Sequence, residues 1–177
     1  HLLVRPHPAN AHHMAKLDDQ DGVTVWPRTG ELPKSEASQQ DFYNSLVHCV
    51  ATFGVNTTGM IDAVINDKPC VTIVTEEYRA TQSDAVHFNH LLEANVLDVT
   101  EGPQESADAI ERIWKGDDCT KRARRLFTLD FVRPRGIDRP AAEFASRAVE
   151  MAGDGKRGTE INAALSQMRT PLEVGVE

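Results

Sequence analysis

The stretch of residues 46–74 most constrains the fold of this chain. The apolar run LVHCVATF leads into the polar turn Gly-Val-Asn-Thr-Thr, a helical pattern follows, and Lys-Pro precedes a second β-branched run. A strand, a helix and a strand in this order make a parallel pair with a right-handed crossover. We predict a strand over residues 46–53 that is buried on both sides, a helix over 58–66 and a strand over 70–74.

The same alternation continues on both sides of this stretch. Further strands are expected at residues 1–4, 23–26 and 96–99, a surface loop at 27–40, and helices at 9–17, 41–45, 84–93, 103–115, 117–127 and 138–153. The pattern predicts an α/β protein with a doubly wound, Rossmann-like parallel sheet of about five to six strands and helices on both faces. Residues 1–153 are expected to form this domain, and residues 154–177 a mobile C-terminal tail.

Composition narrows the class of protein. The chain has 177 residues, is 40% hydrophobic and carries a net charge of -8, which suits one α/β domain with a core. The acidic balance argues against a nucleic-acid partner, and no run approaches the ~20 apolar residues of a membrane span. Of the three cysteines, Cys49 and Cys70 lie in strand-like runs and are expected to be buried and reduced, as in a cytoplasmic protein.

The polar turn is the first candidate site. It comprises Gly54, Asn56, Thr57 and Thr58, and it lies where a predicted strand gives way to a helix. The N–H groups of a helix N-terminus favour anions such as phosphate, and short polar side chains can add hydrogen bonds. Asp62, one turn into the helix, could accept a hydrogen bond from a ribose hydroxyl. The alternative interpretation is an ordinary helix cap followed by a first-turn acid.

The second candidate is the segment Arg5-Pro-His7-Pro, at the carboxyl end of the first predicted strand. Two prolines stiffen the backbone and would display His7, which can bind phosphate or act as an acid. A rigid loop with a satisfied histidine is the alternative.

Two other groups of side chains are weaker candidates. One is a metal-binding face on the helix at residues 84–93, although its first and third ligands diverge on a helix and H-E-x-x-H is absent. The other is a basic cluster, which spreads around its helix and is predicted to be solvated. The metal-binding face comprises His87, His90 and Glu93, and the basic cluster Lys121, Arg122, Arg124 and Arg125. Helix patterns also place Val86, Leu91 and Leu92, and Ile110, Ile113 and Trp114, on inward faces.

Several motifs together resemble a known family. They are V-R-P-H-P, N-S-L-V-H-C-V-A-T-F-G-V-N-T-T-G-M-I-D-A and D-K-P-C-V-T-I, followed by F-N-H-L-L and F-V-R-P-R-G. The ensemble, over residues 1–152, resembles the carboxyl-terminal, donor-nucleotide-binding half of a GT-B glycosyltransferase. It is most similar to the capsule-polysaccharide and CDP-glycerol glycerophosphotransferase-like group.

The resemblance implies a role for each matching residue. His7, helped by Arg5, would contact the donor phosphates and act in catalysis. The turn of Gly54, Asn56, Thr57 and Thr58 would hold the diphosphate. Asp62 would contact the ribose where the family often has the longer Glu, and Ser45 would line the base pocket.

The resemblance also implies the reaction and the partners. The donor would be a nucleotide-diphosphate sugar or CDP-glycerol, used in polysaccharide or cell-envelope biosynthesis. Helix dipoles and basic side chains would stabilise the diphosphate that leaves a nucleotide sugar, with no cofactor and no metal. An acceptor domain, expected to precede this chain, would supply the catalytic base, so the chain alone should bind weakly and catalyse little. The full protein could associate peripherally with a membrane.

Two other functions fit the same fold. One is a nucleotide-sugar 2-epimerase, whose catalytic carboxylates would lie in the other half. The other is a binding module that has kept the fold and lost the catalytic site.

Overall fold

The computed structural model describes residues 1–168 and shows an α/β protein in which every described strand pair is parallel. The chain folds into two compact units, His1–His48 and Cys49–Glu177. The predicted α/β class with parallel strands is confirmed. The described strands form a two-stranded and a three-stranded sheet, where the sequence predicts a single one.

The first unit is built on a short parallel pair. Its strands β1 (Leu2–Val4) and β2 (Val23–Val25) run in register from Leu2 opposite Val23 to Val4 opposite Val25. The connection is largely helical, as predicted for residues 9–17, and the unit ends in α2. These helical elements are η1 (Pro8–Asn10), α1 (Ala11–Met14), η2 (Ala15–Asp19) and α2 (Glu36–His48).

Helix α2 corrects two predictions, because it begins inside the predicted loop and ends inside the predicted strand 46–53. It starts after Ser35, whose hydroxyl accepts from the Ser38 N–H at 3.2 Å, while Ser38 Oγ accepts from the Ser35 N–H at 3.0 Å. This reciprocal capping satisfies N–H groups that a helix start otherwise leaves unpaired. The helix then continues to His48, so the apolar run is shared between the end of a helix and a three-residue strand.

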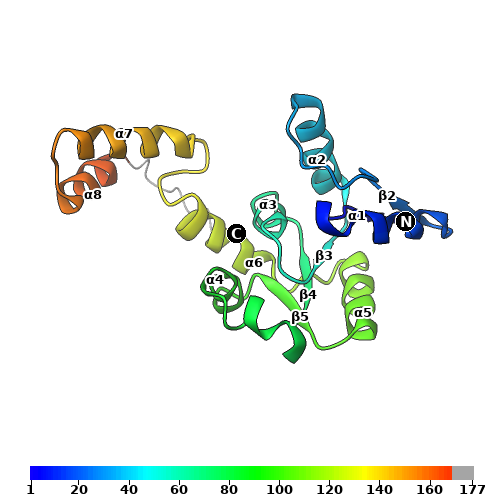
Figure 1. Cartoon of the computed structure of the whole chain (residues 1–177). Coiled ribbons are helices and arrows are strands. Elements are labelled where there is room, and N and C mark those ends of the chain that lie inside the picture. Colours follow the sequence, from blue (N-terminus) through cyan, green and yellow to red (C-terminus); the bar gives the residue numbers. More distant parts are fainter. Residues whose placement is uncertain (169–177) are drawn as a thin grey trace. The chain divides into compact units, whose positions relative to one another are not determined.

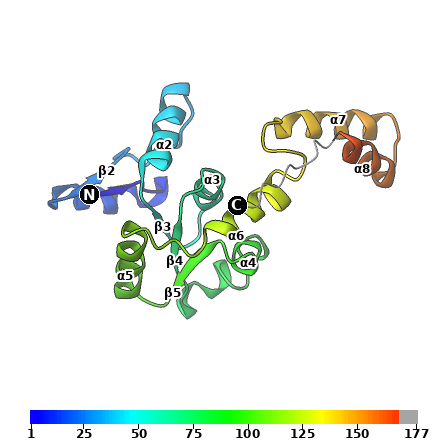
Figure 2. The same cartoon turned by 180° about the vertical axis from the view of Figure 1, so that it is seen from behind.

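The second unit contains the three-stranded sheet, in the order β3-β4-β5, with Thr52, Cys70 and Leu97 in register. Helix α5 packs on one face of this sheet, and α3, α4 and α6 lie on the other (Figures 1 and 2). The described elements of this unit are β3 (Thr52–Gly54), α3 (Gly59–Ile65), β4 (Cys70–Ile73), η3 (Glu76–Thr81), α4 (Val86–Glu93), β5 (Leu97–Thr100), α5 (Pro103–Trp114), α6 (Lys121–Phe127), η4 (Thr128–Val132), α7 (Ala141–Gly153) and α8 (Gly158–Gln167).

The core of this unit is centred on β4. Val71 is fully buried against Ala109 and Ile113 of α5, and Met60 and Val64 are buried on α3. Strand β3 lies at the sheet edge and leaves Phe53 49% exposed, so it is not buried on both sides as predicted.

Two predicted inward positions are wrong. Val86 and Trp114 are each 72% exposed, because each lies at a terminus of its helix, beyond the residues that the helix packs against its neighbours.

The basic cluster on α6 is only partly solvated. Arg124 is 1% exposed and donates to both carboxylate oxygens of Asp118, at 2.8 and 2.7 Å, and to Asp67 Oδ1 at 3.0 Å. The prediction of a solvated face is therefore wrong for Arg124, because two carboxylates and the Thr120 hydroxyl, at 2.6 Å, replace water around its guanidinium. Lys121, Arg122 and Arg125 are not buried, and the prediction holds better for them.

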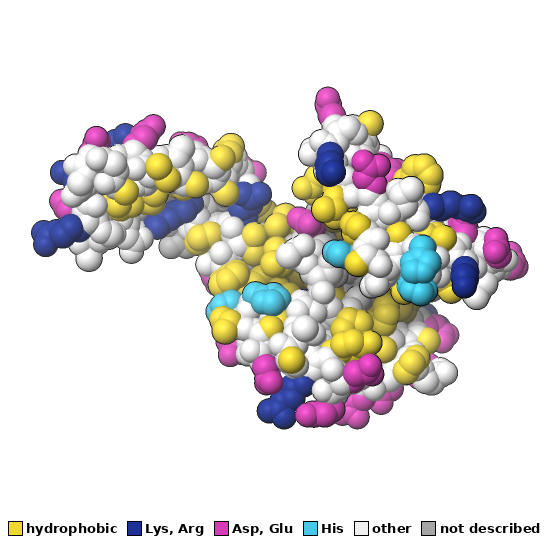
Figure 3. Space-filling view, viewed as in Figure 1, with side chains coloured by type: hydrophobic (Ala, Val, Ile, Leu, Met, Phe, Trp, Pro, Cys, Tyr) yellow, Lys and Arg dark blue, Asp and Glu magenta, His cyan; other side chains and the backbone are white. Residues whose placement is uncertain are grey.

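Helices α7 and α8 pack on each other, and apolar side chains lie along them on the face shown in Figure 3. Helix α8 lies inside the predicted tail. Glu160 Oε2 accepts from the Arg157 N–H at 2.9 Å and so caps the N-terminus of α8, which explains where the helix begins. Residues 169–177 of the predicted tail lie outside the described residues. None of the described helices combines the length and the apolar character that crossing a bilayer requires.

The cysteines differ in accessibility. Burial raises the pKa of the Cys70 thiol to about 11, whereas Cys119 is exposed. Because the thiolate is the reactive form, we expect a thiol-specific reagent at pH 8 to label Cys119 at once and Cys70 only after denaturation. Mass spectrometry of the labelled chain, beside a Cys119→Ser variant, measures this. Equally fast labelling of both residues in the native chain would contradict it.

Candidate functional site

The polar turn of residues 54–58 connects β3 to α3. Strand β3 ends at Gly54 and α3 begins at Gly59, so the turn lies at the carboxyl end of a parallel strand, as predicted. A Cβ atom on Gly54 would lie 3.2 Å from Met60 Cε and 3.3 Å from Thr57 Cγ2. Glycine at this position therefore lets the turn fold back closely over the end of the strand.

Part of the turn caps the helix. Thr57 Oγ1 accepts from the Gly59 N–H at 3.3 Å, and the Thr57 carbonyl accepts from the Met60 N–H at 3.0 Å. The backbone N–H groups of Thr57 and Thr58 and the Thr58 hydroxyl, in contrast, have no partner among the described residues. Both threonines are exposed. The turn therefore provides both a helix cap and a group of unpartnered donors on exposed residues.

Gln82 holds the surroundings of the turn in place. Its side chain is fully buried, and Nε2 donates to the carbonyls of Val55, at 2.8 Å, and Ile73, at 2.6 Å. Its Oε1 accepts from the Thr75 N–H at 3.3 Å. The Gln82 amide thus ties the carboxyl ends of β3 and β4 to the loop that follows η3.

Asn56 is tied to that loop and to α4. Its Nδ2 donates to the Thr81 carbonyl and lies 3.2 Å from Nε2 of His87, in the first turn of α4. His87 thus joins the polar groups around the turn. The sequence pattern suggests His87 only as a metal ligand, and no local signal relates it to Asn56, which is 31 residues away.

Asp62 lies one turn into α3. Its carboxylate has no partner among the described residues, and burial raises its pKa above the ordinary value. A half-buried carboxylate without a donor is available to a ligand hydroxyl and is poorly placed for stability alone.

Asp62→Asn is therefore expected to leave the free energy of unfolding at pH 7 within about 0.5 kcal/mol of native, or above it. A raised pKa in the folded state means that ionised Asp62 opposes folding above that pKa. Any gain should disappear as the pH falls below the ordinary carboxyl pKa, where both states are protonated. Urea unfolding at pH 7 and at low pH, beside the control Asp130→Asn, measures this. A clear loss at pH 7 in Asp62→Asn alone would show a structural partner.

In the first unit, Arg5 and Ser45 meet. Arg5 Nη1 lies 3.5 Å from Ser45 Oγ and 3.5 Å from Asp41 Oδ2, and its guanidinium lies over the Phe42 ring at 5.3 Å. Asp41 Oδ2 also accepts from Trp26 Nε1 at 2.5 Å. These contacts hold Arg5 against α2, so its charge is already partly balanced by Asp41.

His7 keeps one ring nitrogen available. Nδ1 accepts from the Ala9 N–H at 3.2 Å, so a neutral ring carries its hydrogen on Nε2, which has no partner among the described residues. Gly30, at φ 66°, packs closely on this segment, because a Cβ atom there would lie 3.0 Å from Pro8 Cα and 3.1 Å from the carbonyl carbon of His7. The stiff loop predicted from the two prolines is thus supported from a second side.

The structure therefore presents the predicted site residues in two groups. Arg5, His7 and Ser45 belong to the first unit, and the turn with Asp62 belongs to the second. Within residues 1–168, no group of three or more His, Cys, Asp or Glu side chains could hold a metal ion, so the metal-binding face suggested by His87, His90 and Glu93 does not form.

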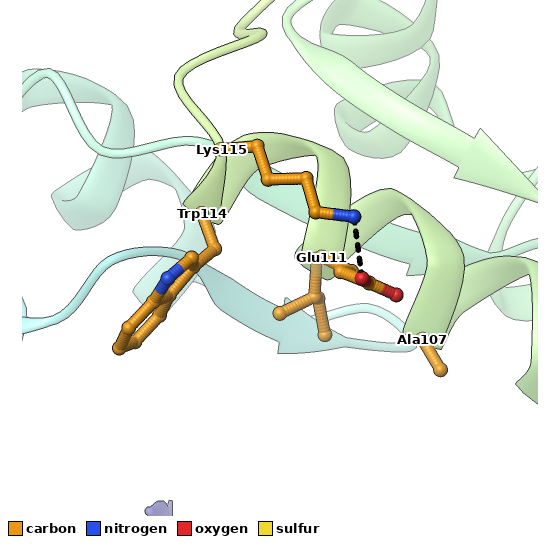
Figure 4. Close-up of a pocket in the computed structure, with 5 residues that line it drawn as sticks. Ala107, Glu111, Trp114 and Lys115 are labelled. Carbon is orange, nitrogen blue, oxygen red and sulfur yellow. Dashed lines mark hydrogen bonds and ion pairs between the residues drawn. The ribbon is translucent and has the colours of Figure 1, made fainter.

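A shallow pocket of about 570 Å³ lies elsewhere, on the outer surface of α5. Its lining includes Ala107, Ile110 and Trp114, beside the ion pair of Lys115 Nζ with Glu111 Oε1 at 2.5 Å (Figure 4). None of the predicted site residues lines this pocket. Its open, mainly apolar surface offers a diphosphate only the already paired Lys115.

No protein-family model, curated protein or solved structure matches this chain. The similarity to a GT-B half is carried by the sequence motifs, and the structure supports an α/β chain with parallel strands.

Proposed function

We propose that this chain is the donor-nucleotide-binding domain of a glycosyltransferase or glycerophosphotransferase of the GT-B kind. The observation that supports it best is the turn after β3. There the N–H groups of Thr57 and Thr58 and the Thr58 hydroxyl belong to exposed residues and have no partner among the described residues. Donors grouped at the carboxyl end of a parallel strand suit a phosphate.

The remaining groups suit a nucleoside diphosphate better than an isolated phosphate. Asp62 offers an unpartnered carboxylate to a ribose hydroxyl, one helical turn from the phosphate donors. The motif resemblance, by itself, assigns His7 and Arg5 of the first unit to the donor phosphates as well. These residue types can bind a diphosphate without a metal.

The reaction is proposed from the motif resemblance. Transfer of a sugar or glycerol phosphate leaves a nucleotide product whose phosphate charge rises in the transition state. N–H groups and cationic side chains fixed before the reaction would stabilise that charge. The acceptor and the catalytic base would come from another domain. The proposal also keeps the single doubly wound sheet that the sequence predicts, whereas the described strands form two sheets.

Calorimetric titration with CDP, UDP, GDP and ADP tests the proposal. We expect one of these ligands to bind, and Thr58→Ala and His7→Ala each to weaken binding about tenfold through the loss of a hydrogen bond to a charged group. Thr58→Ser, which keeps the hydroxyl, should bind as native. Thr159→Ala, an exposed threonine on α8, is the matched control.

Two results would contradict the proposal. One is that no diphosphate binds at millimolar concentration. The other is that a diphosphate binds equally well to the native chain, Thr58→Ala and His7→Ala.

A further inference from the structure

Helix α5 carries two apolar stripes. The first, which includes Ala109 and Ile113, is buried against β4. The second lies on an adjacent face, where Ala107, Ile110 and Trp114 follow one another at intervals of three and four residues. Ile110 also packs against the core, whereas Trp114 is 72% exposed. The sheet therefore covers the first stripe and leaves the second at the surface, with the spacing that is typical of a seam between two helices.

The second stripe is large at one end and small at the other. Trp114 ends α5, Ala107 lies about two turns before it, and both project from the same side of the helix (Figure 4). Together with Ile110 they line the open pocket of about 570 Å³. If two such faces meet with their helices antiparallel, each indole lies over Ala107 and Ile110 of the other copy. A large side chain opposite a small one is the arrangement in which packed helices interdigitate.

Charged side chains flank this stripe on one side. Glu111 pairs with Lys115 at 2.5 Å, and Asp108, which accepts from Gln104 at 3.0 Å, lies on the same flank. The two-fold axis of an antiparallel helix pair keeps equivalent flanks together and reverses their direction. Lys115 of each copy then faces Asp108 and Glu111 of the other. The flank thus complements a second copy of itself, although the chain as a whole carries a net charge of -8.

We propose that this outer face of α5 binds a second copy of the chain and forms a two-fold symmetric dimer. The face is formed by Ala107, Ile110, Glu111, Trp114 and Lys115. It contains none of the residues of the candidate site, so the dimer does not rest on the proposed function. One helix from each copy buries less than the ~1,600 Å² of a standard interface, so the association should be reversible and depend on concentration.

Sedimentation equilibrium of the chain over a range of concentrations tests the proposal. The native chain should shift from monomer to dimer as its concentration rises. Trp114→Ala should raise the dimer dissociation constant about a hundredfold or more, because each dimer loses two central tryptophans. Trp114 is exposed in the single chain, so the variant should still fold. Val149→Ala, on α7 and also 72% exposed in the native chain, is the matched control and should dimerise as native.

Charge reversal identifies the occupant of the face. Glu111→Lys and Lys115→Glu should each raise the dissociation constant about tenfold, because like charges then meet at two equivalent places. The double variant carries both reversals in every copy and restores opposite charges across the two-fold axis. It should therefore dimerise more tightly than either single variant. A double variant that is as weak as the single variants would show that a second copy does not bind in this way.

Fluorescence gives another readout. The chain has two tryptophans, so Trp26→Phe leaves Trp114 as the only one. The emission of this variant should move to shorter wavelength as the dimer forms, because the indole leaves water. Three results would overturn the proposal: a native chain that is monomeric at every concentration, association that Trp114→Ala leaves unchanged, or a Trp114 emission already typical of a buried indole in the monomer.

Discussion

Replacing Arg124 by methionine is expected to destabilise the second unit by about 3 kcal/mol, the low end for breaking a buried ion pair from one side, because the Asp67 side chain is itself 48% exposed. Arg124 is 1% exposed and holds both oxygens of Asp118 together with Asp67 Oδ1. It also donates to the Asp67 carbonyl at 3.2 Å, which ties α6 to the turn between α3 and β4. Methionine fills similar space and leaves Asp118 Oδ2 and Asp67 Oδ1 without a donor, whereas Asp118 Oδ1 still accepts from the Thr120 N–H and hydroxyl at 3.3 and 3.2 Å.

The loss should depend on pH. Arg124 holds the pKa of Asp118 below the ordinary carboxyl value. This stabilisation is present above the unfolded-state pKa and is lost as the pH falls through the lower pKa of the folded state. The difference between native and Arg124→Met should therefore be largest near neutral pH and smaller in acid.

Urea unfolding across this pH range measures both effects. Arg122→Met, on the exposed side of the same helix, is the matched control and should stay within about 0.5 kcal/mol of native. Equal stability of the two variants at pH 7 would show that the Arg124 cluster contributes nothing net.

Gln82→Leu is expected to lower the free energy of unfolding by about 2–4 kcal/mol, because two part-buried backbone groups lose their bonds to a fully buried side chain. These are the Ile73 carbonyl and the Thr75 N–H, whereas the Val55 carbonyl still accepts from Thr72 Oγ1 at 3.1 Å. Gln82→Glu should be at least as harmful at neutral pH. A carboxylate has no hydrogen to donate, and it would face two carbonyl oxygens.

Chemical denaturation gives the loss, and hydrogen exchange at residues 73–82 shows where it acts. Gln167→Leu, an exposed glutamine on α8, is the matched control. Native stability in Gln82→Leu would mean that the loop after β4 does not depend on this side chain. Gln82 also bonds to the carbonyl of Val55, which directly precedes Asn56 in the turn. Gln82→Leu should therefore weaken diphosphate binding too.

Local patterns were sufficient for much of the fold. β-branched residues at 70–74 predicted β4 to within one residue, and Gly102-Pro103 and Gly116 predicted the ends of α5. Gly116 adopts φ 95°, and Asn95, which follows the end of α4, adopts φ 54°. Each of these signals depends on the conformational preference of the residue itself, so the sequence shows it directly.

Other features depend on partners that are distant in the chain. Residues 46–53 are apolar enough for either a helix or a buried strand. The helix that starts after the capping at Ser35 takes the first part of this run, and the pairing of Thr52 with Cys70 makes the last part a strand. Arg124 is buried because Asp67, 57 residues earlier, faces it. The turn of the candidate site could be located from its sequence. The contacts of Gln82 with Val55 and of His87 with Asn56 could not be predicted, because no pattern near Gln82 or His87 indicates them.

The parallel strands also determine how this chain must reach its folded state. Each ladder joins residues that are separated in sequence by at least one intervening helical segment, so no described strand pair can form by zipping up a hairpin. Loop closure therefore precedes any gain from pairing, which makes folding slow compared with a helical bundle of this size. During that interval the edges of β3 and β5 are open to other chains, and aggregation competes with folding. Yield on refolding should consequently fall with protein concentration more steeply than native stability alone would suggest.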